Sequence, residues 1–281
     1  MTNLFSIILK FFIFILLLST ISCSSNIIKK KEKKVAERNV EEIYNSAMDY
    51  IDDNKFLTAH DELIEVERLH PYSIWATRSQ IMMAYVNYKL YKYDDSIAGA
   101  KRYIELHPGA NDIDYAFYLI ALNYYEQIND FRRDQTFTEN AREAFNNLIR
   151  RFPNSDYAKD AKLKLDLVND HLAAKEMDVG RTYQKLDNYV SAINRFKTVV
   201  DLYSKTSHVP EALARLTEMY YKLGLYQEAK VYASVLGYNY PENKWYLYSY
   251  SLFQKEKEIL INNEENSYLN ILDEFLDIFG N

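Results

Sequence analysis

Glycine, proline and cysteine are all scarce in this sequence, with 6, 5 and 1 copies among 281 residues. So few glycines and prolines disfavour a β-rich domain, because such a domain needs many turns. A single cysteine excludes an intramolecular disulfide. Apolar residues, in contrast, make up 48% of the chain, which is enough for a sizeable core and too many for wholesale disorder. The composition therefore favours a helical protein.

Catalytic and nucleotide-binding motifs are also missing. The sequence has no HExxH, CxxC or GxSxG pattern and no glycine-rich phosphate loop. Of the five histidines, His70 and His107 occupy equivalent positions before a proline, so a structural role explains both. The net charge of −6, without a basic patch, argues against nucleic acid as a partner. We therefore expect a protein that is not an enzyme and that needs no cofactor and no metal.

A recurring spacing organises residues 56–241. One residue is followed three positions later by a small residue, and twelve positions after that by a proline or a serine. The five copies are Phe56/Ala59/Pro71, Tyr93/Ser96/Pro108, Thr138/Ala141/Pro153, Tyr189/Ala192/Ser204 and Tyr226/Ala229/Pro241. Twelve positions before the central small residue, most copies have another one, at Ala47, Ala84, Gly180 and Thr217. The pattern resembles the tetratricopeptide repeat, in which two helices touch through small residues and a proline ends the second.

The repeats predict an all-α solenoid of five helix-turn-helix units; a generic helical bundle with chance spacing is the alternative. Expected helices are 37–53, 56–69, 73–91, 94–107, 112–128, 138–152, 189–203, 208–223 and 226–238. Two intervals between stop residues exceed the 37 residues that separate Pro71 from Pro108. The first surplus is assigned to a loop at 129–137. The second predicts one long joining helix over about 156–186, where no strong helix breaker occurs.

Residues 1–22 are expected to be a signal peptide. Lys10 precedes an apolar run, and small residues lead to Cys23. This arrangement resembles a bacterial lipoprotein signal, in which the cysteine is acylated and becomes the first residue, although Thr20 stands where leucine is usual. An uncleaved membrane anchor and an ordinary signal peptide with an incidental cysteine are the alternatives. Residues 23–36 would then be a lipidated flexible tether, whose lysines are either solvated or near anionic headgroups.

The concave face of a solenoid is built by the first helix of each repeat, and this face is the expected binding groove. In the first three repeats, 37–153, the positions expected to face it are Tyr44, Met48, Arg78, Ile81, Tyr85, Tyr88, Tyr115, Tyr118, Leu122 and Tyr125. Aromatic and methionine side chains suit an extended apolar peptide. The equivalent positions in 154–241 are more polar: Met177, Arg181, Gln184, Ala214, Glu218 and Tyr221. The two halves are therefore expected to bind different partners.

Beyond the repeat spacing itself, several specific segments resemble one family. They are Asp112–Tyr115, Arg132–Gln135 leading into Ala141–Phe145, Phe152–Tyr157 and Ala192–Arg195. Together with the lipoprotein-like Cys23 and the five-repeat plan, they are similar to the BamD family, the tetratricopeptide lipoproteins of the outer-membrane β-barrel assembly machine. The resemblance covers about residues 23–240.

This resemblance implies a non-enzymatic scaffold, anchored by lipid to the outer membrane and facing the periplasm. The front repeats would receive unfolded outer-membrane proteins, and the back repeats would dock on the POTRA domains of BamA, with other Bam lipoproteins as further partners. The implied substrate residues are Arg78, Tyr85, Tyr88, Tyr115, Tyr118 and Tyr125. The implied BamA-docking residues are Arg195 and Arg181, with an ordinary helix-surface charge as the alternative for Arg195. The alternative function is a periplasmic repeat lipoprotein that regulates a cell-wall synthase or the Tol-Pal system.

Residues 242–281 are expected to form C-terminal capping helices and a tail. The first capping helix would include Trp245. Further on, apolar residues keep a helical spacing at Tyr268, Leu269, Leu272, Phe275, Leu276 and Phe279, and Asp273, Glu274 and Asp277 lie off that stripe. This tail either covers the last repeat or docks on a partner.

Overall fold

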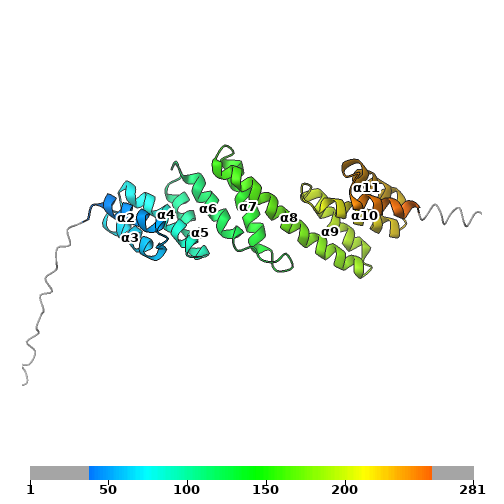
Figure 1. The fold of residues 1–281 in the computed structure, drawn as a ribbon, viewed down its shortest axis with the longest axis horizontal. Helices are drawn as coiled ribbons and strands as arrows, with labels where there is room; N and C mark the ends of the chain where they lie inside the picture. Colours follow the sequence, from blue (N-terminus) through cyan, green and yellow to red (C-terminus); the bar gives the residue numbers. More distant parts are fainter. Residues whose placement is uncertain (1–37, 255–281) are drawn as a thin grey trace, which may run out of the picture.

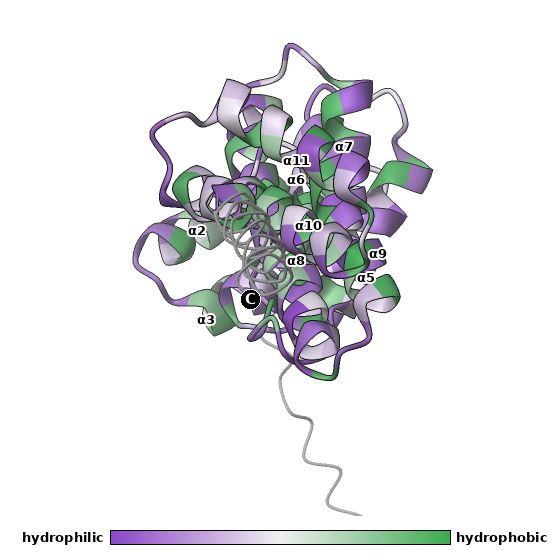
Figure 2. Cartoon of the chain, turned by 90° about the vertical axis from the view of Figure 1, so that its right-hand side faces the viewer, coloured by the Kyte–Doolittle hydropathy of each residue, from purple (hydrophilic) through white to green (hydrophobic). Residues whose placement is uncertain are grey.

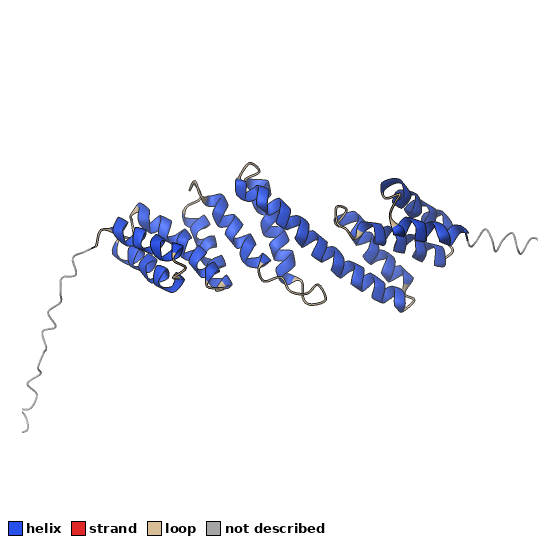
Figure 3. Cartoon of the chain, viewed as in Figure 1, coloured by secondary structure: helices blue, strands red, loops and turns tan. Residues whose placement is uncertain are grey.

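The structure is a computed structural model that describes residues 38–254. In that range the chain forms helices and connecting loops, without a strand (Figure 3). The helices are α2 (Val40–Asp52), α3 (Phe56–Leu69), α4 (Ile74–Lys89), α5 (Tyr93–Leu106), α6 (Ile113–Tyr125), α7 (Thr136–Arg151), α8 (Asp156–Lys185), α9 (Tyr189–Leu202), α10 (Val209–Lys222) and α11 (Tyr226–Asn239). A further helical stretch, 244–254, closes the described part. The expected signal peptide, tether and tail lie outside the described residues.

Consecutive helices pack against each other and form an elongated row, which Figure 1 shows from α2 at one end to α11 at the other. The pairs α2/α3, α4/α5, α6/α7, α8/α9 and α10/α11 are five repeats, and α8 is the long joining helix. The predicted all-α tetratricopeptide solenoid is therefore confirmed. Along each helix, apolar segments alternate with polar ones in the end-on view of Figure 2, as expected where one face packs and the other is solvated.

The second helix of each repeat ends in the same backbone conformation. The five residues that follow these helices have φ between −123° and −138° and ψ between 38° and 59°: His70, His107, Phe152, Tyr203 and Tyr240. A proline follows four of them, and the residue before a proline is sterically driven out of the α region. Tyr203 precedes Ser204 instead, so its conformation comes from packing, because its side chain is buried in the core.

The small residues of the repeat spacing lie where the two helices of a repeat touch. Ala47, Ala84 and Thr217 are all buried, and so is Gly180 of α8. A Cβ on Gly180 would lie 2.5 Å from the ring of Phe196 on α9, so only glycine fits at this contact. Repeat three supplies Ala121, which is also fully buried. The interval of twelve residues does not reach Ala121, because the loop inserted between α6 and α7 lengthens the interval to Ala141.

The turns inside the repeats share a left-handed residue two positions before the second helix. These residues are Asn54, Tyr91, Asp187 and Gly224, with φ of 58°, 60°, 55° and 74°. Repeat three differs because residues 126–135 form the expected inserted loop. There Gln135 donates from Nε2 to the backbone carbonyl of Arg133 at 3.0 Å, which orders the loop before α7.

The long helix α8 joins the two halves through one continuous core. It contains 30 residues, or about 45 Å at the usual rise. Val168 and Leu172 of α8 belong to the same buried cluster as Phe145 of α7 and Phe196 of α9. The additional helical turns hold α7 and α9 apart on one side, and they leave Leu167 exposed. This separation produces one of the two candidate sites.

Candidate functional site

Five tyrosines from three helices meet on the front repeats. Tyr85 and Tyr88 come from α4, Tyr115 and Tyr118 from α6, and Tyr157 from the first turn of α8. The ring centroid of Tyr157 lies 5.2 Å from that of Tyr115 and 5.1 Å from that of Tyr118. Tyr85 and Tyr88 are close enough to Tyr115 to influence its pKa electrostatically. We call these five residues the aromatic cluster.

The sequence pattern pointed to four members of this cluster and missed Tyr157. Tyr157 lies in the first turn of α8, four residues after Pro153. The repeat register predicts groove positions only near the other end of α8, at Met177, Arg181 and Gln184. Its presence in the segment Phe152–Tyr157, one of those that resemble the family, is the signal that could have pointed to it.

Carboxylates anchor the hydroxyl groups at the edge of the cluster. The Tyr118 hydroxyl donates to Asp160, and the Tyr88 hydroxyl donates to Glu126 at 3.2 Å. Both rings remain half-buried, so their faces stay partly accessible. Asp160 also binds Lys164, whose Nζ lies 2.9 Å from its Oδ2. A carboxylate can accept up to about four hydrogen bonds, so both carboxylates retain acceptor capacity. The site therefore offers aromatic surface bordered by hydrogen-bond acceptors.

Three tyrosines of the cluster, Tyr88, Tyr115 and Tyr118, are held in their neutral form. Burial, together with the neighbouring tyrosines, raises the pKa of Tyr115 well above its ordinary value. Burial and the adjacent Glu126 raise the pKa of Tyr88 to about 12. Burial and the hydrogen bond to Asp160 raise the pKa of Tyr118 as well. The cluster therefore has the chemistry of an apolar recognition surface with neutral hydroxyls, and it lacks a phenolate nucleophile at neutral pH.

The remaining groove positions of the front repeats are more dispersed. Arg78 stacks on the ring of Trp75 at 5.0 Å, two helical turns before Tyr85 on α4. Tyr125 packs edge-on against Phe145 at 6.0 Å and borders a cleft of about 620 Å³ beside the inserted loop. Ile81 is buried in the core, so its predicted place in the groove is wrong.

The first helices of the back half are tied together by charge. Arg181 of α8 binds Glu211 of α10 through two bonds, Nε to Oε1 at 3.0 Å and Nη2 to Oε2 at 3.1 Å. Gln184 donates to Glu218 at 3.1 Å. Glu218 also pairs with Arg215 at 3.0 Å and with Lys222 at 3.2 Å. We call these six residues the ion-pair network: Arg181, Gln184, Glu211, Arg215, Glu218 and Lys222.

Two other predicted groove positions of the back half, Met177 and Ala214, are fully buried. Their predicted place in the groove is therefore wrong. Burial alone would raise the pKa of Glu218, but hydrogen bonds from Tyr248, Arg215 and Lys222 outweigh it and hold that pKa below its ordinary value. Glu218 is thus charged, and its hydrogen-bonding capacity is taken up by groups of this chain, although Arg181 and Lys222 of the same face remain partly exposed.

Arg195 lies elsewhere, on α9. Its Nη1 atom is 3.1 Å from Oε2 of Glu176 on α8, and 44% of its side chain is exposed. Arg181 and Arg195 therefore bind different carboxylates on different helices, and the structure does not bring the two predicted docking residues into one cluster. Arg195 is the more accessible of the two.

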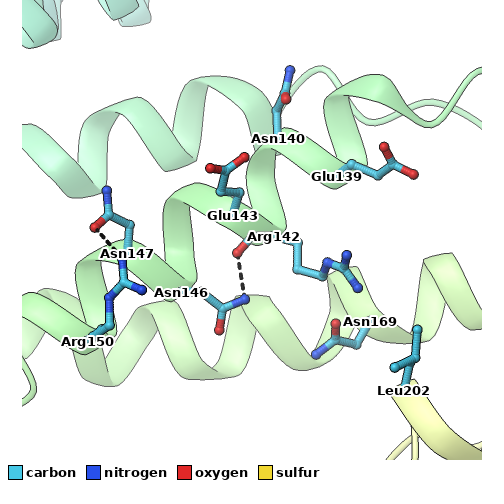
Figure 4. A pocket seen from close by; sticks show the side chains of 9 residues that line it. All are labelled: Glu139, Asn140, Arg142, Glu143, Asn146, Asn147, Arg150, Asn169 and Leu202. Atoms are coloured by element: carbon cyan, nitrogen blue, oxygen red, sulfur yellow. Dashed lines mark hydrogen bonds between the residues drawn. The ribbon is translucent and has the colours of Figure 1, made fainter.

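A polar groove of about 740 Å³ runs between α7 and α9, with α8 as its floor. Figure 4 shows its lining: Glu139, Asn140, Arg142, Glu143, Asn146, Asn147, Arg150, Asn169 and Leu202. Tyr203, at the end of α9, receives a hydrogen bond from Arg142 at 3.3 Å, and Glu176 lies near enough to affect its pKa. The Arg195–Glu176 pair is therefore close to this groove, which we call the α7–α9 groove. The concave-face positions do not predict this groove, because its lining lies mainly on a second helix, α7. The long interval between Pro153 and Ser204 does predict the extra length of α8, on which the groove depends.

Two negative findings apply to residues 38–254. No group of three or more His, Cys, Asp or Glu side chains is placed to hold a metal ion there. None of the helices in that range is both long enough and apolar enough to span a membrane.

A protein-family model described as "YfiO: Outer membrane lipoprotein" matches residues 36–236. The chain belongs to the YfiO family of outer membrane lipoproteins. Among the relatives of this YfiO-family chain is the outer membrane protein assembly factor BamD of Caulobacter vibrioides, 47% identical over 224 residues, which are 80% of this chain and 73% of that protein. The BamD of Rickettsia prowazekii is 44% identical over 223 residues, 79% of this chain and 89% of that protein. The family predicted from the sequence segments is confirmed.

Solved structures similar to this YfiO-family chain are tetratricopeptide repeat proteins. One from Thermus thermophilus is 15% identical, with a TM-score of 0.37 over 77% of this chain and 100% of the other. The TPR2AB domain of yeast Sti1 is 13% identical, with a TM-score of 0.42 over 78% of this chain and 84% of the other.

Proposed function

We propose that this protein is a non-enzymatic scaffold of outer-membrane protein assembly, which holds unfolded β-barrel segments on its front repeats and docks on a BamA-like protein through its back repeats. Membership of the YfiO family and relatives named as assembly factors support this role. The observation that carries it is the aromatic cluster, because its rings remain partly accessible as apolar surface, whereas the polar groups on the equivalent face of the back half already bind one another in the ion-pair network.

The aromatic cluster suits an extended apolar strand. Tyrosine rings give large, rigid contact area at low entropic cost, and alternate side chains of a strand project to the same side. The carboxylates of Glu126 and Asp160 border the rings and can accept from the N–H groups of such a strand. The substrate class is therefore an extended, aromatic or aliphatic segment of an unfolded outer-membrane protein. Arg78 and Tyr125 extend the same surface towards its two ends.

Docking is assigned to Arg195 and the neighbouring α7–α9 groove. A carboxylate of a POTRA domain could replace Glu176 as the partner of Arg195, because an arginine fork binds carboxylates in a bidentate geometry. The polar lining of the groove supplies amides and charges that suit a non-obligate interface. Arg181 contributes by holding α10 against α8 through Glu211. Other Bam lipoproteins are further candidate partners.

The proposed location is the periplasmic face of the outer membrane, with acylated Cys23 as the anchor. Cys23→Ala should move the protein from the membrane fraction to the soluble periplasm. Unchanged membrane association would point to an uncleaved anchor instead.

The substrate assignment is tested with the triple variant Tyr85→Ala/Tyr88→Ala/Tyr118→Ala. We expect at least tenfold weaker binding of a fluorescent peptide taken from the last strand of an outer-membrane barrel, with the helical circular dichroism retained. Tyr72→Ala is the matched control, because Tyr72 is fully exposed and lies outside the aromatic cluster. Wild-type affinity in the triple variant would remove the assignment.

The docking assignment is tested by affinity capture from solubilised envelopes. The wild-type protein should recover a POTRA-bearing barrel in near-equal amount, and Arg195→Glu should lose it. Arg68→Glu on α3 reverses an exposed charge in repeat one, two repeats away from the α7–α9 groove, and should retain it. Recovery of a cell-wall synthase or a Tol-Pal component in place of the barrel would establish the alternative function.

A further inference from the structure

The outer face of the last repeat differs from the same face of the other four. On each second helix, the positions two, six and nine residues after the small residue can be compared directly. In the first four repeats they are Asp61/Glu65/Arg68, Ala98/Arg102/Glu105, Glu143/Asn147/Arg150 and Asn194/Thr198/Asp201. On α11 they are Val231, Val235 and Tyr238, and all three are exposed. Side chains that are almost all polar elsewhere are thus replaced by large apolar ones.

The helical stretch 244–254 extends this apolar face. Leu247 is 64% exposed and Tyr250 is 52% exposed, beside Tyr238 at 88%. The two elements approach closely here, because a Cβ on Gly237 would lie 2.6 Å from the Tyr246 ring. We call Val231, Val235, Tyr238, Leu247 and Tyr250 the terminal apolar patch.

An uncovered patch of this kind is unusual at the end of a solenoid. Terminal repeats normally present a polar outer face, because no further repeat follows to bury an apolar one. Contiguous exposed apolar surface on a soluble domain usually marks a place where something binds. The change from polar to apolar residues at equivalent positions of the second helices therefore indicates that another segment or molecule packs on the terminal apolar patch.

We propose that residues 268–279 of this chain cover it as an amphipathic helix. Five of the eight apolar residues of the segment follow the intervals of a second repeat helix. On α5, Ser96, Ile97, Ala100 and Tyr103 are buried and Ile104 packs against them. The same intervals, counted from Tyr268, give Leu269, Leu272, Phe275 and Leu276. The segment thus has the apolar face that a packed second helix requires.

Chain length and charge both allow this placement. Residues 255–267 connect Gln254 to the segment, and 13 residues can span up to about 40 Å. The patch begins at Tyr250, only one helical turn before Gln254, so the connection reaches it easily. Off the apolar stripe the segment carries Asp273, Glu274 and Asp277, and exposed Lys230 and Lys244 lie next to patch residues on α11 and the following helical stretch. Exposed Glu228 and Glu242 also lie near the patch, so the charges around it are mixed and neither favour nor oppose the acidic segment. The placement therefore rests on the chain length and on the apolar spacing.

Disulfide trapping tests the placement directly. Cys23 is the only cysteine, so the full-length Cys23→Ser chain is a cysteine-free background. Tyr238→Cys combined with Leu272→Cys should form an intramolecular disulfide at least tenfold faster than the control pair Asp201→Cys with Leu272→Cys. Asp201 occupies on α9 the position that Tyr238 occupies on α11, and both side chains are exposed. Equal rates for both pairs, or absence of a disulfide in both, would overturn the proposal, and so would a covalent dimer, which would assign the patch to a second copy.

A second measurement keeps the proposal testable if the cysteine variants fold poorly. Leu272→Asp with Phe275→Asp should increase amide hydrogen exchange in 231–250 at least fivefold and leave α4 and α6 unchanged. Asn270→Asp with Asp277→Asn, off the apolar stripe, should leave exchange in 231–250 as in the wild type. Unchanged exchange in the first variant would show that the segment does not cover the patch. Neither experiment depends on a substrate or on BamA, so the proposed function can fail while this placement stands.

Discussion

The inner face of the front repeats and that of the back repeats occupy the same register with opposite chemistry. Tyr85 of α4 corresponds to Arg181 of α8 and to Glu218 of α10. Tyr88 corresponds to Gln184 and to Tyr221, and Tyr221 is the aromatic exception in the back half. In front, neighbouring first helices meet through aromatic rings with hydroxyls bound to carboxylates. In the back, they meet through the ion-pair network, whose members bind one another. The position of a residue within the repeat thus determines whether it lies on the inner face. The type of side chain determines whether that face offers free apolar surface or polar groups that already bind one another.

The two inner faces should also contribute differently to the stability of the protein and to ligand binding. Side chains of the ion-pair network bind one another, so removing one leaves partly buried charges of this chain with fewer partners. The tyrosines of the aromatic cluster contribute apolar surface, part of which is available to a ligand. Changes in the back half should therefore reduce stability most, whereas changes in the front half should reduce binding most.

Glu218→Ala should give the largest effect. Gln184 and Lys222 would lose their bonds to Glu218, and Arg215 would keep only its longer ion pair with Glu211 at 3.5 Å. The cost should be about 3 kcal/mol in the free energy of unfolding. Urea denaturation followed by circular dichroism measures it. Tyr85→Ala, at the equivalent position, should cost less stability and weaken peptide binding instead. If Tyr85→Ala destabilised more than Glu218→Ala, the contrast between the two faces would fail.

Gly180→Ala should come next. The added Cβ would meet the Phe196 ring at 2.5 Å, so the joint between α8 and α9 must shift. Overpacking outweighs the better helix propensity of alanine and leaves a net loss of about 1.5 kcal/mol. Gly109→Ala is the control, because no atom lies within 4 Å of the added group there. Equal midpoints of urea unfolding for the two variants would contradict this packing.

Acid and alkali should then act on opposite halves. The pKa of Glu218 is lowered on folding, so its stabilisation is present above its ordinary value of 4.5 and is lost as the pH falls below it. The pKa of Tyr88 is raised from 10.0 to about 12, so its stabilisation is present below pH 10 and is lost between these two values. The pKa of Asp160 in the front half is lowered too, and that of Tyr248 in the back half is raised to about 12. The front half should still lose more stability in alkali, because the pKa values of Tyr115 and Tyr118 are raised there as well. The back half should lose more in acid, because three side chains hydrogen-bond to Glu218.

Two tryptophans report on the halves separately. Trp75 lies on α4 and Trp245 after α11, so single-tryptophan variants can follow urea unfolding at each end over a range of pH. Glu218→Gln should abolish the acid-side difference, and Tyr88→Phe should reduce the alkaline one. Identical midpoints for both tryptophans at every pH would contradict the assignment.

The smallest expected effect is a stabilisation at Tyr91. Its φ of 60° is unfavourable for a bulky side chain, and Asn54 occupies the same turn position in repeat one. Tyr91→Asn should raise the free energy of unfolding by about 0.5 kcal/mol, since asparagine tolerates this conformation. The reverse change, Asn54→Tyr, should lower it by a similar amount. Thermal denaturation of both variants checks the pair.

Much of the fold could be predicted because its rules are local. Small residues at fixed intervals, stop prolines and helix-forming runs gave the five repeats and α8 to within a few residues. Ile81, Met177 and Ala214 show where this reasoning fails. Their register marks the inner side of a helix, but only packing against the neighbouring helices decides whether such a side chain lines the surface or enters the core.

The candidate sites divide in the same way. Four tyrosines of the aromatic cluster could be predicted from helical spacing, whereas Tyr157 joins them from a helix that begins after the stop proline. The α7–α9 groove was not predicted, because it depends on how far the additional turns of α8 separate two other helices.

The sequence by itself determined the repeat, its ends and its family, since helix contacts and stop signals depend on residues close together in the chain. The tertiary structure alone decided which carboxylate each arginine binds. It also decided that Tyr203 ends α9 without a following proline, and that the last repeat exposes an apolar face. These properties depend on side chains from different helices, whose distances are set only when the helices pack.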